Sequence, residues 1–129
     1  MTRVLALDYG SARCGCAVSD PTRTLATPLP AIDRPGTETG LKAIAELVRE
    51  QDAACVVVGL PVSLSGEEGA QAAEARAFAE RLRAVVGVPV ESWDERFTTR
   101  MAQATPGRHA EDSRAAAHLL QGWLEARRS

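Results

Sequence analysis

Three acidic positions, far apart in the chain, have the residue types for metal-dependent chemistry. Asp8 ends the apolar run "VLALD", Asp94 and Glu95 together follow the segment "GVPVESW", and Asp112 lies at the beginning of a helical stretch. Carboxylates brought together repel one another unless a cation lies between them, and Mg²⁺ or Mn²⁺ prefers such oxygen ligands. Two such ions, about 3.5–4 Å apart, can activate a water and stabilise the leaving oxygen in phosphodiester hydrolysis. If these acids converge, the sequence predicts a metal-dependent hydrolytic site.

The final helical stretch indicates which way Asp112 faces. When Asp112 is set at zero and about 100° is added per residue, five apolar positions fall within about 80° of it. These are Ala116, Leu119, Leu120, Trp123 and Ala126, whereas Arg114, His118, Gln121 and Glu125 lie opposite. Asp112 therefore belongs to the stripe expected to pack on a sheet, where Asp8 and Glu95 could be its neighbours.

Each acid also has an ordinary structural interpretation. Asp8, just before a Tyr-Gly pair, could begin an Asx-type turn. Asp94 or Glu95 could form a surface ion pair or cap the helix that follows. Asp112 could be an N-cap or a first-turn acid of the final helix. Only the convergence of all three positions would require a catalytic explanation.

The apolar pattern predicts the elements that would position these acids. Alternating or wholly apolar runs predict strands over residues 3–8, 13–19, 24–32, 54–61 and 87–93. Helical spacing predicts helices over 41–49, 70–86 and 111–127, with a short helix near 98–104. The order β-β-β-α-β-α-β-α predicts one α/β domain over residues 1–129, with a mixed sheet and helices on both faces. Prolines place the third strand at an edge.

Composition narrows the class of protein. The 129 residues are 45% apolar and 25% charged, as in an ordinary globular domain, and the net charge of −2 does not indicate nucleic-acid binding. No stretch approaches a membrane span of about 18–20 apolar residues or resembles a signal peptide. Three cysteines without a CxxC motif predict reduced core thiols in a cytoplasmic protein.

Four motifs, taken in order, resemble those of a known family. "LALDYGSARCGCAVSD", "VVVGLPVSLSGEEG", "WDERFTT" and "DSRAAAHLLQGWL" are similar to the motifs of the YqgF (RuvX-like) family of Holliday junction resolvases and pre-16S rRNA nucleases. The resemblance covers nearly the whole chain. It implies an RNase H-like fold and a cytoplasmic, divalent-metal-dependent nuclease that acts on precursor rRNA or branched DNA.

The resemblance also implies roles for individual residues. Asp8 would be the first-strand metal ligand, Glu95 or its neighbour Asp94 the second, and Asp112 the helical acid. Glycines and hydroxyls ahead of a helix can receive a phosphate, and arginines can contact phosphates that flank the metal. The expected substrate-binding residues are Arg13, Gly59, Ser65, Gly66, Arg96, Arg100 and Arg114. An ordinary strand-to-helix loop and solvated charges are the alternative interpretations.

Two other functions remain open from sequence. The chain could be a non-catalytic nucleic-acid-binding or ribosome-assembly factor on the same fold, since the fold alone does not imply function and the net charge is acidic. "DYGSARCG" also resembles the phosphate loop of actin-like ATP-binding proteins, although this chain has no second such loop. A homodimer would be needed to resolve a four-way junction symmetrically.

Overall fold

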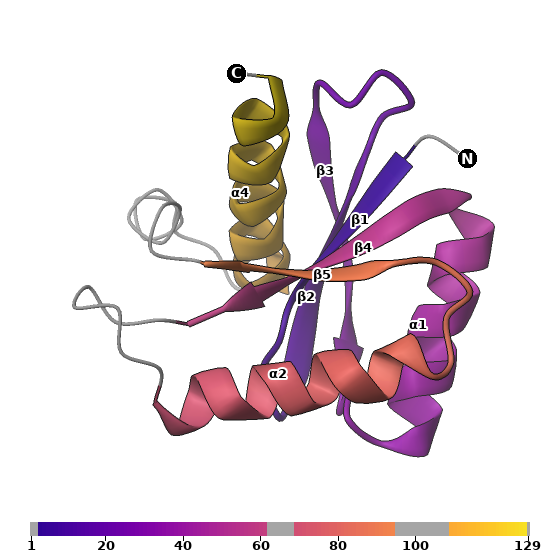
Figure 1. Ribbon diagram of the computed structural model, residues 1–129, viewed down its shortest axis with the longest axis vertical. Coiled ribbons are helices and arrows are strands. Elements are labelled where there is room, and N and C mark those ends of the chain that lie inside the picture. The colour runs from indigo at the N-terminus through magenta and orange to yellow at the C-terminus, as the bar shows by residue number, and fades with distance from the viewer. Residues whose placement is uncertain (1–2, 62–68, 95–108, 129) are drawn as a thin grey trace.

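A five-stranded mixed sheet forms the centre of the molecule (Figure 1). The computed structural model describes residues 3–61, 69–94 and 109–128, with the backbone alone for 109–112 and 128. The strands lie in the order β3-β2-β1-β4-β5. The elements along the chain are β1 (Arg3–Asp8), β2 (Arg13–Ser19), β3 (Ala26–Asp33), α1 (Glu38–Glu50), β4 (Ala53–Leu60), α2 (Ala70–Arg83), β5 (Val90–Asp94) and α4 (His109–Arg128).

The topology agrees with the prediction from sequence. β1 and β2 form an antiparallel hairpin, β3 pairs antiparallel with β2 at the sheet edge, and β4 and β5 continue the sheet parallel to β1. The expected short helix near 98–104 lies outside the described residues. Across the described ranges, no helix is long and apolar enough to cross a bilayer.

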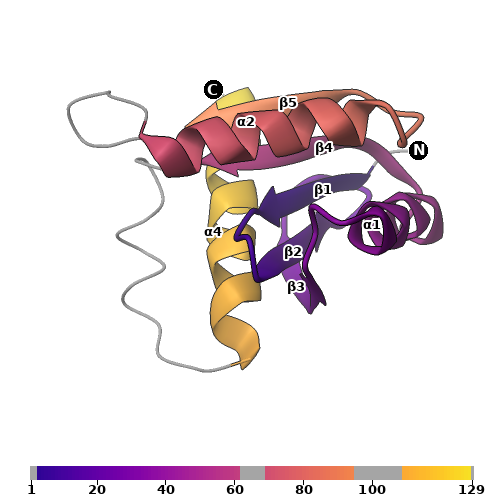
Figure 2. The same ribbon diagram turned by 90° about the horizontal axis from the view of Figure 1, so that it is seen from below.

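Each face of the sheet is covered by helices, which gives the molecule two apolar cores (Figures 1 and 2). Leu5 and Leu7 of β1 belong to the core under α1 and α2, whereas Val4 and Ala6 belong to the core under α4. Because successive side chains of a strand point to opposite faces, β1 must be apolar on both sides. The free thiols of Cys14 and Cys16 are buried under α1 and α2, and the free thiol of Cys55 is half-buried on the α4 face.

A single serine joins the beginning of α4 to an irregularity between β2 and β3. The register of the β2–β3 pairing shifts between Cys14 and Cys16, so that Cys16 lies opposite Leu29. The next residue, Pro30, has no backbone N–H to donate to the neighbouring strand. The buried Ser113 hydroxyl donates to the Leu29 carbonyl and accepts the Cys16 N–H at 3.5 Å. Ser113 thereby pairs backbone groups of two strands and fixes the helix beside them.

The other end of α4 is attached to the far edge strand. The Arg127 guanidinium lies 4.4 Å from the centre of the Trp123 ring and forms an ion pair with Glu91 of β5. The predicted apolar stripe of α4 is buried at Ala116, Leu119, Leu120 and Trp123, as expected. The prediction is wrong at Ala126, which is exposed, whereas Leu124, outside the predicted stripe, is buried.

The turn from β1 to β2 depends on a glycine. A Cβ added at Gly10 would lie 2.6 Å from the carbonyl oxygen of Arg13, closer than real Cβ atoms approach a backbone oxygen. Gly10 therefore lets the chain fold back tightly within two residues of Asp8. The glycine therefore turns the backbone away from the end of β1.

Replacing Ser113 by alanine should destabilise the fold by about 1–3 kcal/mol, because a buried carbonyl and a buried N–H would each lose a partner. Urea unfolding of the Ser113→Ala variant measures the change. Ser92→Ala, at a half-buried position on β5, is the serine-to-alanine control. Equal stability of the two variants would contradict a bridging role for Ser113.

Gly10→Ala should also lower the free energy of unfolding, by about 1–3 kcal/mol, because the added methyl group forces the turn to shift. The matched control is Gly87→Ala, since a Cβ at Gly87 would meet nothing within 4 Å. Thermal unfolding of both variants tests the prediction, which fails if Gly10→Ala is no less stable than Gly87→Ala.

Candidate active site

The carboxyl ends of three parallel strands, β1, β4 and β5, meet at one edge of the sheet. Ligands of open α/β sheets bind at such an edge. Asp8 is the last residue of β1 and Asp94 is the last residue of β5. The prediction that both strands end on the same rim is therefore confirmed.

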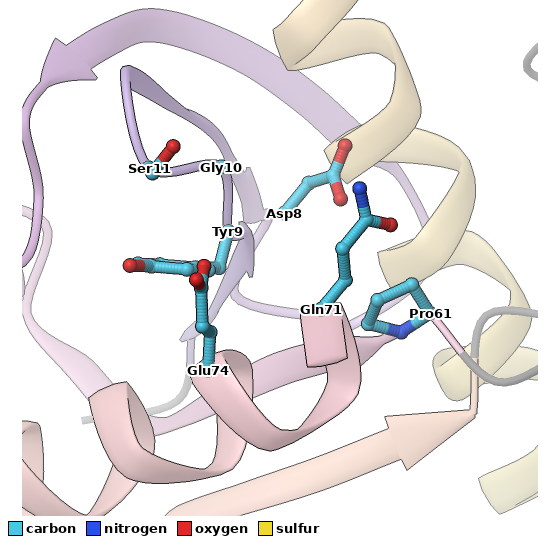
Figure 3. Close-up of a pocket in the computed structure, with 7 residues that line it drawn as sticks. All are labelled: Asp8, Tyr9, Gly10, Ser11, Pro61, Gln71 and Glu74. Carbon is cyan, nitrogen blue, oxygen red and sulfur yellow. The ribbon is translucent and has the colours of Figure 1, made fainter. Parts of the chain in front are cut away.

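Asp8 lies on the face of the sheet that α4 covers. It has the strand parity of Val4 and Ala6, whose side chains pack under α4, and it is half-buried. Figure 3 shows its carboxylate extending toward α4. The first-strand acid and the final helix therefore share one face, as the prediction of convergence requires.

Glycines occupy the neighbouring positions on both adjacent strands. Asp8 pairs directly with Gly15 of β2, and Gly59 of β4 follows the paired residues Leu7 and Val58. Directly opposed side chains on neighbouring strands have Cβ atoms only about 4.5–5.5 Å apart, so any larger residue would crowd the carboxylate. Gly59, which the resemblance singled out, and Gly15, which lies within the first matched motif, thus have a physical reason: they leave room around Asp8.

Asp94 lies on the opposite face from Asp8. Asp94 pairs with Leu60, and four residues earlier on the same two strands Val90 pairs with Val56. Residues an even number apart on a strand point to the same face of the sheet. Both valines belong to the core under α1 and α2. Trp93, the neighbour of Asp94, packs on the α4 side instead. The described part of β5 therefore does not turn the Asp94 side chain toward Asp8.

The remaining predicted acids lie at the limits of the described chain. Asp112 belongs to the beginning of α4, next to the Ser113 anchor, and only its backbone is described. Glu95, Ser65, Gly66, Arg96 and Arg100 lie outside the described residues. Within the described part of the chain, no three His, Cys, Asp or Glu side chains are close enough to hold a metal ion.

Two arginines expected at the substrate can be placed. Arg13 begins β2, is exposed, and lies 3.9 Å from the Asp33 carboxylate. It lines a groove with Pro30, Ala31 and Asp33 beside the β3 edge rather than the pocket that contains Asp8. Arg114 follows Ser113 on α4 and is half-buried.

A pocket of about 280 Å³ adjoins Asp8 (Figure 3). It is enclosed by the β1–β2 turn, the end of β4 and the first two turns of α2, and is lined by Asp8, Tyr9, Gly10, Ser11, Pro61, Gln71 and Glu74. Among these residues are two carboxylates and no lysine or arginine. The described lining of the pocket is therefore polar and acidic.

Tyr9 forms a rigid wall of this pocket. Its ring stacks on Phe78 of α2, with the ring centres 4.6 Å apart. Burial raises the pKa of the Tyr9 hydroxyl, and the negative charge of Glu74 raises it further. The hydroxyl therefore stays protonated at neutral pH and remains a hydrogen-bond donor.

Sequence reasoning did not identify Tyr9, Gln71 or Glu74 as site residues. Two signals were present: Tyr9 directly follows Asp8, and the other two residues lie one turn apart at the beginning of a helix that follows a glycine-rich segment. Helical spacing shows only that Gln71 and Glu74 lie outside the buried stripe of α2. It does not show that the exposed side of this turn lies beside Asp8.

Comparison with known proteins shows the family to which the chain belongs. The family model "RuvX: Holliday junction resolvase" matches residues 2–126. Proteins named "Putative pre-16S rRNA nuclease" from Anaeromyxobacter sp. (strain Fw109-5) and Gluconobacter oxydans (strain 621H) are 43% and 41% identical to this chain. The matches cover 97% and 98% of this chain and 98% and 85% of the relatives.

Solved resolvase structures share the fold. The T. thermophilus RuvC structure in complex with a Holliday junction superposes with a TM-score of 0.62 at 17% identity, over 100% of this chain and 97% of that one. The Fowlpox virus resolvase bound to Holliday junction DNA gives 0.60 at 10% identity, over 98% and 99%. The expected RNase H-like fold is confirmed, and the chain belongs to the RuvX family.

Proposed function

We propose that this protein is a divalent-metal-dependent nuclease that hydrolyses phosphodiester bonds in structured nucleic acid, with residues 1–129 acting as one nuclease domain. The observation that carries the proposal is the placement of Asp8. It is a carboxylate at the end of the central strand, on the face covered by the final helix, with glycine at the adjacent positions of both neighbouring strands. Membership of the RuvX family supports the same activity.

The residues at this edge fit a hard cation. Asp8 supplies an oxygen donor in a space that two glycines keep open, and Asp112 belongs to the helix packed on the same face. Asp94 lies on the other face, which supports Glu95 as the second strand acid. Asp8, Glu95 and Asp112 would hold Mg²⁺ or Mn²⁺, and such an ion would activate water and offset charge on the scissile phosphate.

The protein contributes rigidity and placement to this reaction. Asp8 is held by a strand with partners on both sides, and Ser113 fixes the beginning of α4 next to β2 and β3. A carboxylate held on such elements needs little reorganisation when a substrate binds. After Asp8, the stacking of Tyr9 on Phe78 and the tight turn at Gly10 hold the backbone in place.

The names of the relatives, rather than the shape of the pocket, suggest which substrates to test. The curated relatives are named for pre-16S rRNA and the family model for Holliday junctions, so a precursor rRNA fragment and a four-way DNA junction are the two substrates to compare. Symmetric cleavage of a junction would require a homodimer. The free cysteines agree with action in the cytoplasm.

Asp8→Asn should abolish cleavage while leaving the fold and the binding of nucleic acid intact. Changes around a metal site that leave its ligands in place cost about 10–100-fold, so loss of a direct ligand should reduce the rate by more than about 100-fold. Cleavage of both substrates by wild type and variant in Mg²⁺, Mn²⁺ or EDTA measures this. EDTA should reproduce the effect of the variant on the wild-type protein.

The cleavage assay of wild type and Asp8→Asn distinguishes a nuclease from a non-catalytic binding or assembly factor. A purely binding protein would give no metal-dependent cleavage, and Asp8→Asn would leave every binding and cellular phenotype unchanged. Electrophoretic mobility shifts in EDTA with the same two substrates provide the binding control.

The two adjacent acids after Trp93 should differ in their effects on cleavage. Because Asp94 lies on the α1 and α2 face, Asp94→Asn should retain activity within about 10-fold of wild type, whereas Glu95→Gln should lose as much as Asp8→Asn. Single-turnover cleavage rates at saturating Mg²⁺ compare the three variants. The reverse order would assign the second ligand to Asp94.

A further inference from the structure

The pocket beside Asp8 has the chemistry of a nucleobase site. We propose that it takes one base of the bound nucleic acid next to the cleaved phosphate, and that Gln71 and Glu74 read guanine there. The inference rests on the proposed nuclease function, because the pocket shares Asp8 with the candidate metal site.

The described lining of the pocket, without a bound cation, favours a neutral group that donates hydrogen bonds over an anionic one. The described lining contains the carboxylates of Asp8 and Glu74 and no cationic side chain. Without a cation between them, carboxylates repel an anionic group and favour hydrogen-bond donors. The amino and imino N–H groups of a base are such donors, and they carry no charge to desolvate.

The two readout residues form one recognition edge. Gln71 and Glu74 are three residues apart in α2, so they are neighbours on one side of the helix with Cβ atoms about 5–6 Å apart. Both are exposed and both line the pocket, and Figure 3 shows the Gln71 side chain reaching toward Asp8. Together they present an amide and a carboxylate to the same pocket.

Guanine matches this pair better than the other bases. Its Watson–Crick edge offers two adjacent donors, N1–H and the 2-amino group, which one carboxylate can accept together, and its O6 accepts from an amide N–H. Uracil presents two carbonyl oxygens on either side of its single N–H, so a carboxylate opposite it meets like partial charges. Adenine and cytosine each offer one amino group beside an acceptor.

The size and walls of the pocket suit a single base. Its volume of about 280 Å³ lies just below the range of about 300–1,000 Å³ that is typical of drug-sized ligands. The Pro61 ring and the Tyr9 ring, which is held by Phe78, provide apolar surfaces of the kind on which bases pack. A base displaced from its stack beside the cleaved bond could enter without moving the backbone.

Nucleotide titrations of the intact, metal-free protein test this subsite independently of cleavage. GMP, IMP, AMP, CMP, UMP and inorganic phosphate would each be titrated in EDTA, with the Gln71 side-chain amide and the Gly10 and Ser11 backbone amides followed by ¹⁵N NMR. IMP lacks only the 2-amino group of GMP. We expect GMP to half-saturate these shifts at about 10-fold lower concentration than IMP or UMP.

Two variants on α2 complete the test. Glu74→Gln should remove the preference for GMP over IMP, whereas Glu80→Gln should keep it, because Glu80 is exposed and pairs with Arg83 away from the pocket. Shifts that are absent, equal for all nucleotides or reproduced by inorganic phosphate would overturn the guanine subsite. Those results would leave the nuclease proposal standing, which instead fails if Asp8→Asn still cleaves.

Discussion

β1 must satisfy four sets of neighbours at once, and the rest of the structure depends on that constraint. It pairs with β2 on one edge and β4 on the other, and it contributes side chains to both apolar cores. A strand in this position can hardly shift, because a slip of one residue would exchange its two faces. Its last residue, Asp8, therefore has a fixed direction, and a charged group can stay at the rim of an apolar sheet without loosening it.

The alternation of β1 divides the rim into two surfaces. Asp8 extends toward α4, whereas the next residue, Tyr9, packs on Phe78 of α2. The two surfaces meet at the tight turn at Gly10, so chemistry at the carboxylate and recognition in the adjoining pocket share one rigid segment. Substitutions in α2 can in this way change which substrates fit without altering the carboxylate itself.

The sequence predicted most of the fold because its apolar patterns were long and had a clear period. The mixed sheet with helices on both faces, the edge position of β3 and the buried stripe of α4 were all predicted correctly, apart from the exposed Ala126. For the site, sequence could place Asp8 and Asp94 on one rim but could not choose between Asp94 and Glu95. The pairing of Leu60 with Asp94 adds the strand parity of Asp94, and this parity supports the proposal of Glu95. Gln71 and Glu74 were missed because their proposed role depends on the packing of the beginning of α2 beside Asp8. Residue spacing within one helix does not show which segment lies next to it.

The attachment of α4 has a consequence for the order of assembly during synthesis. The helix is made after all five strands, yet it covers the face that carries Asp8 and supplies the hydroxyl that pairs Cys16 with Leu29. A nascent chain that lacks this helix leaves Val4, Ala6 and Val57 in water and lacks Asp112, which the proposed metal site requires. The growing polypeptide would therefore be catalytically silent while it is still on the ribosome, among the very RNA that its relatives are named for.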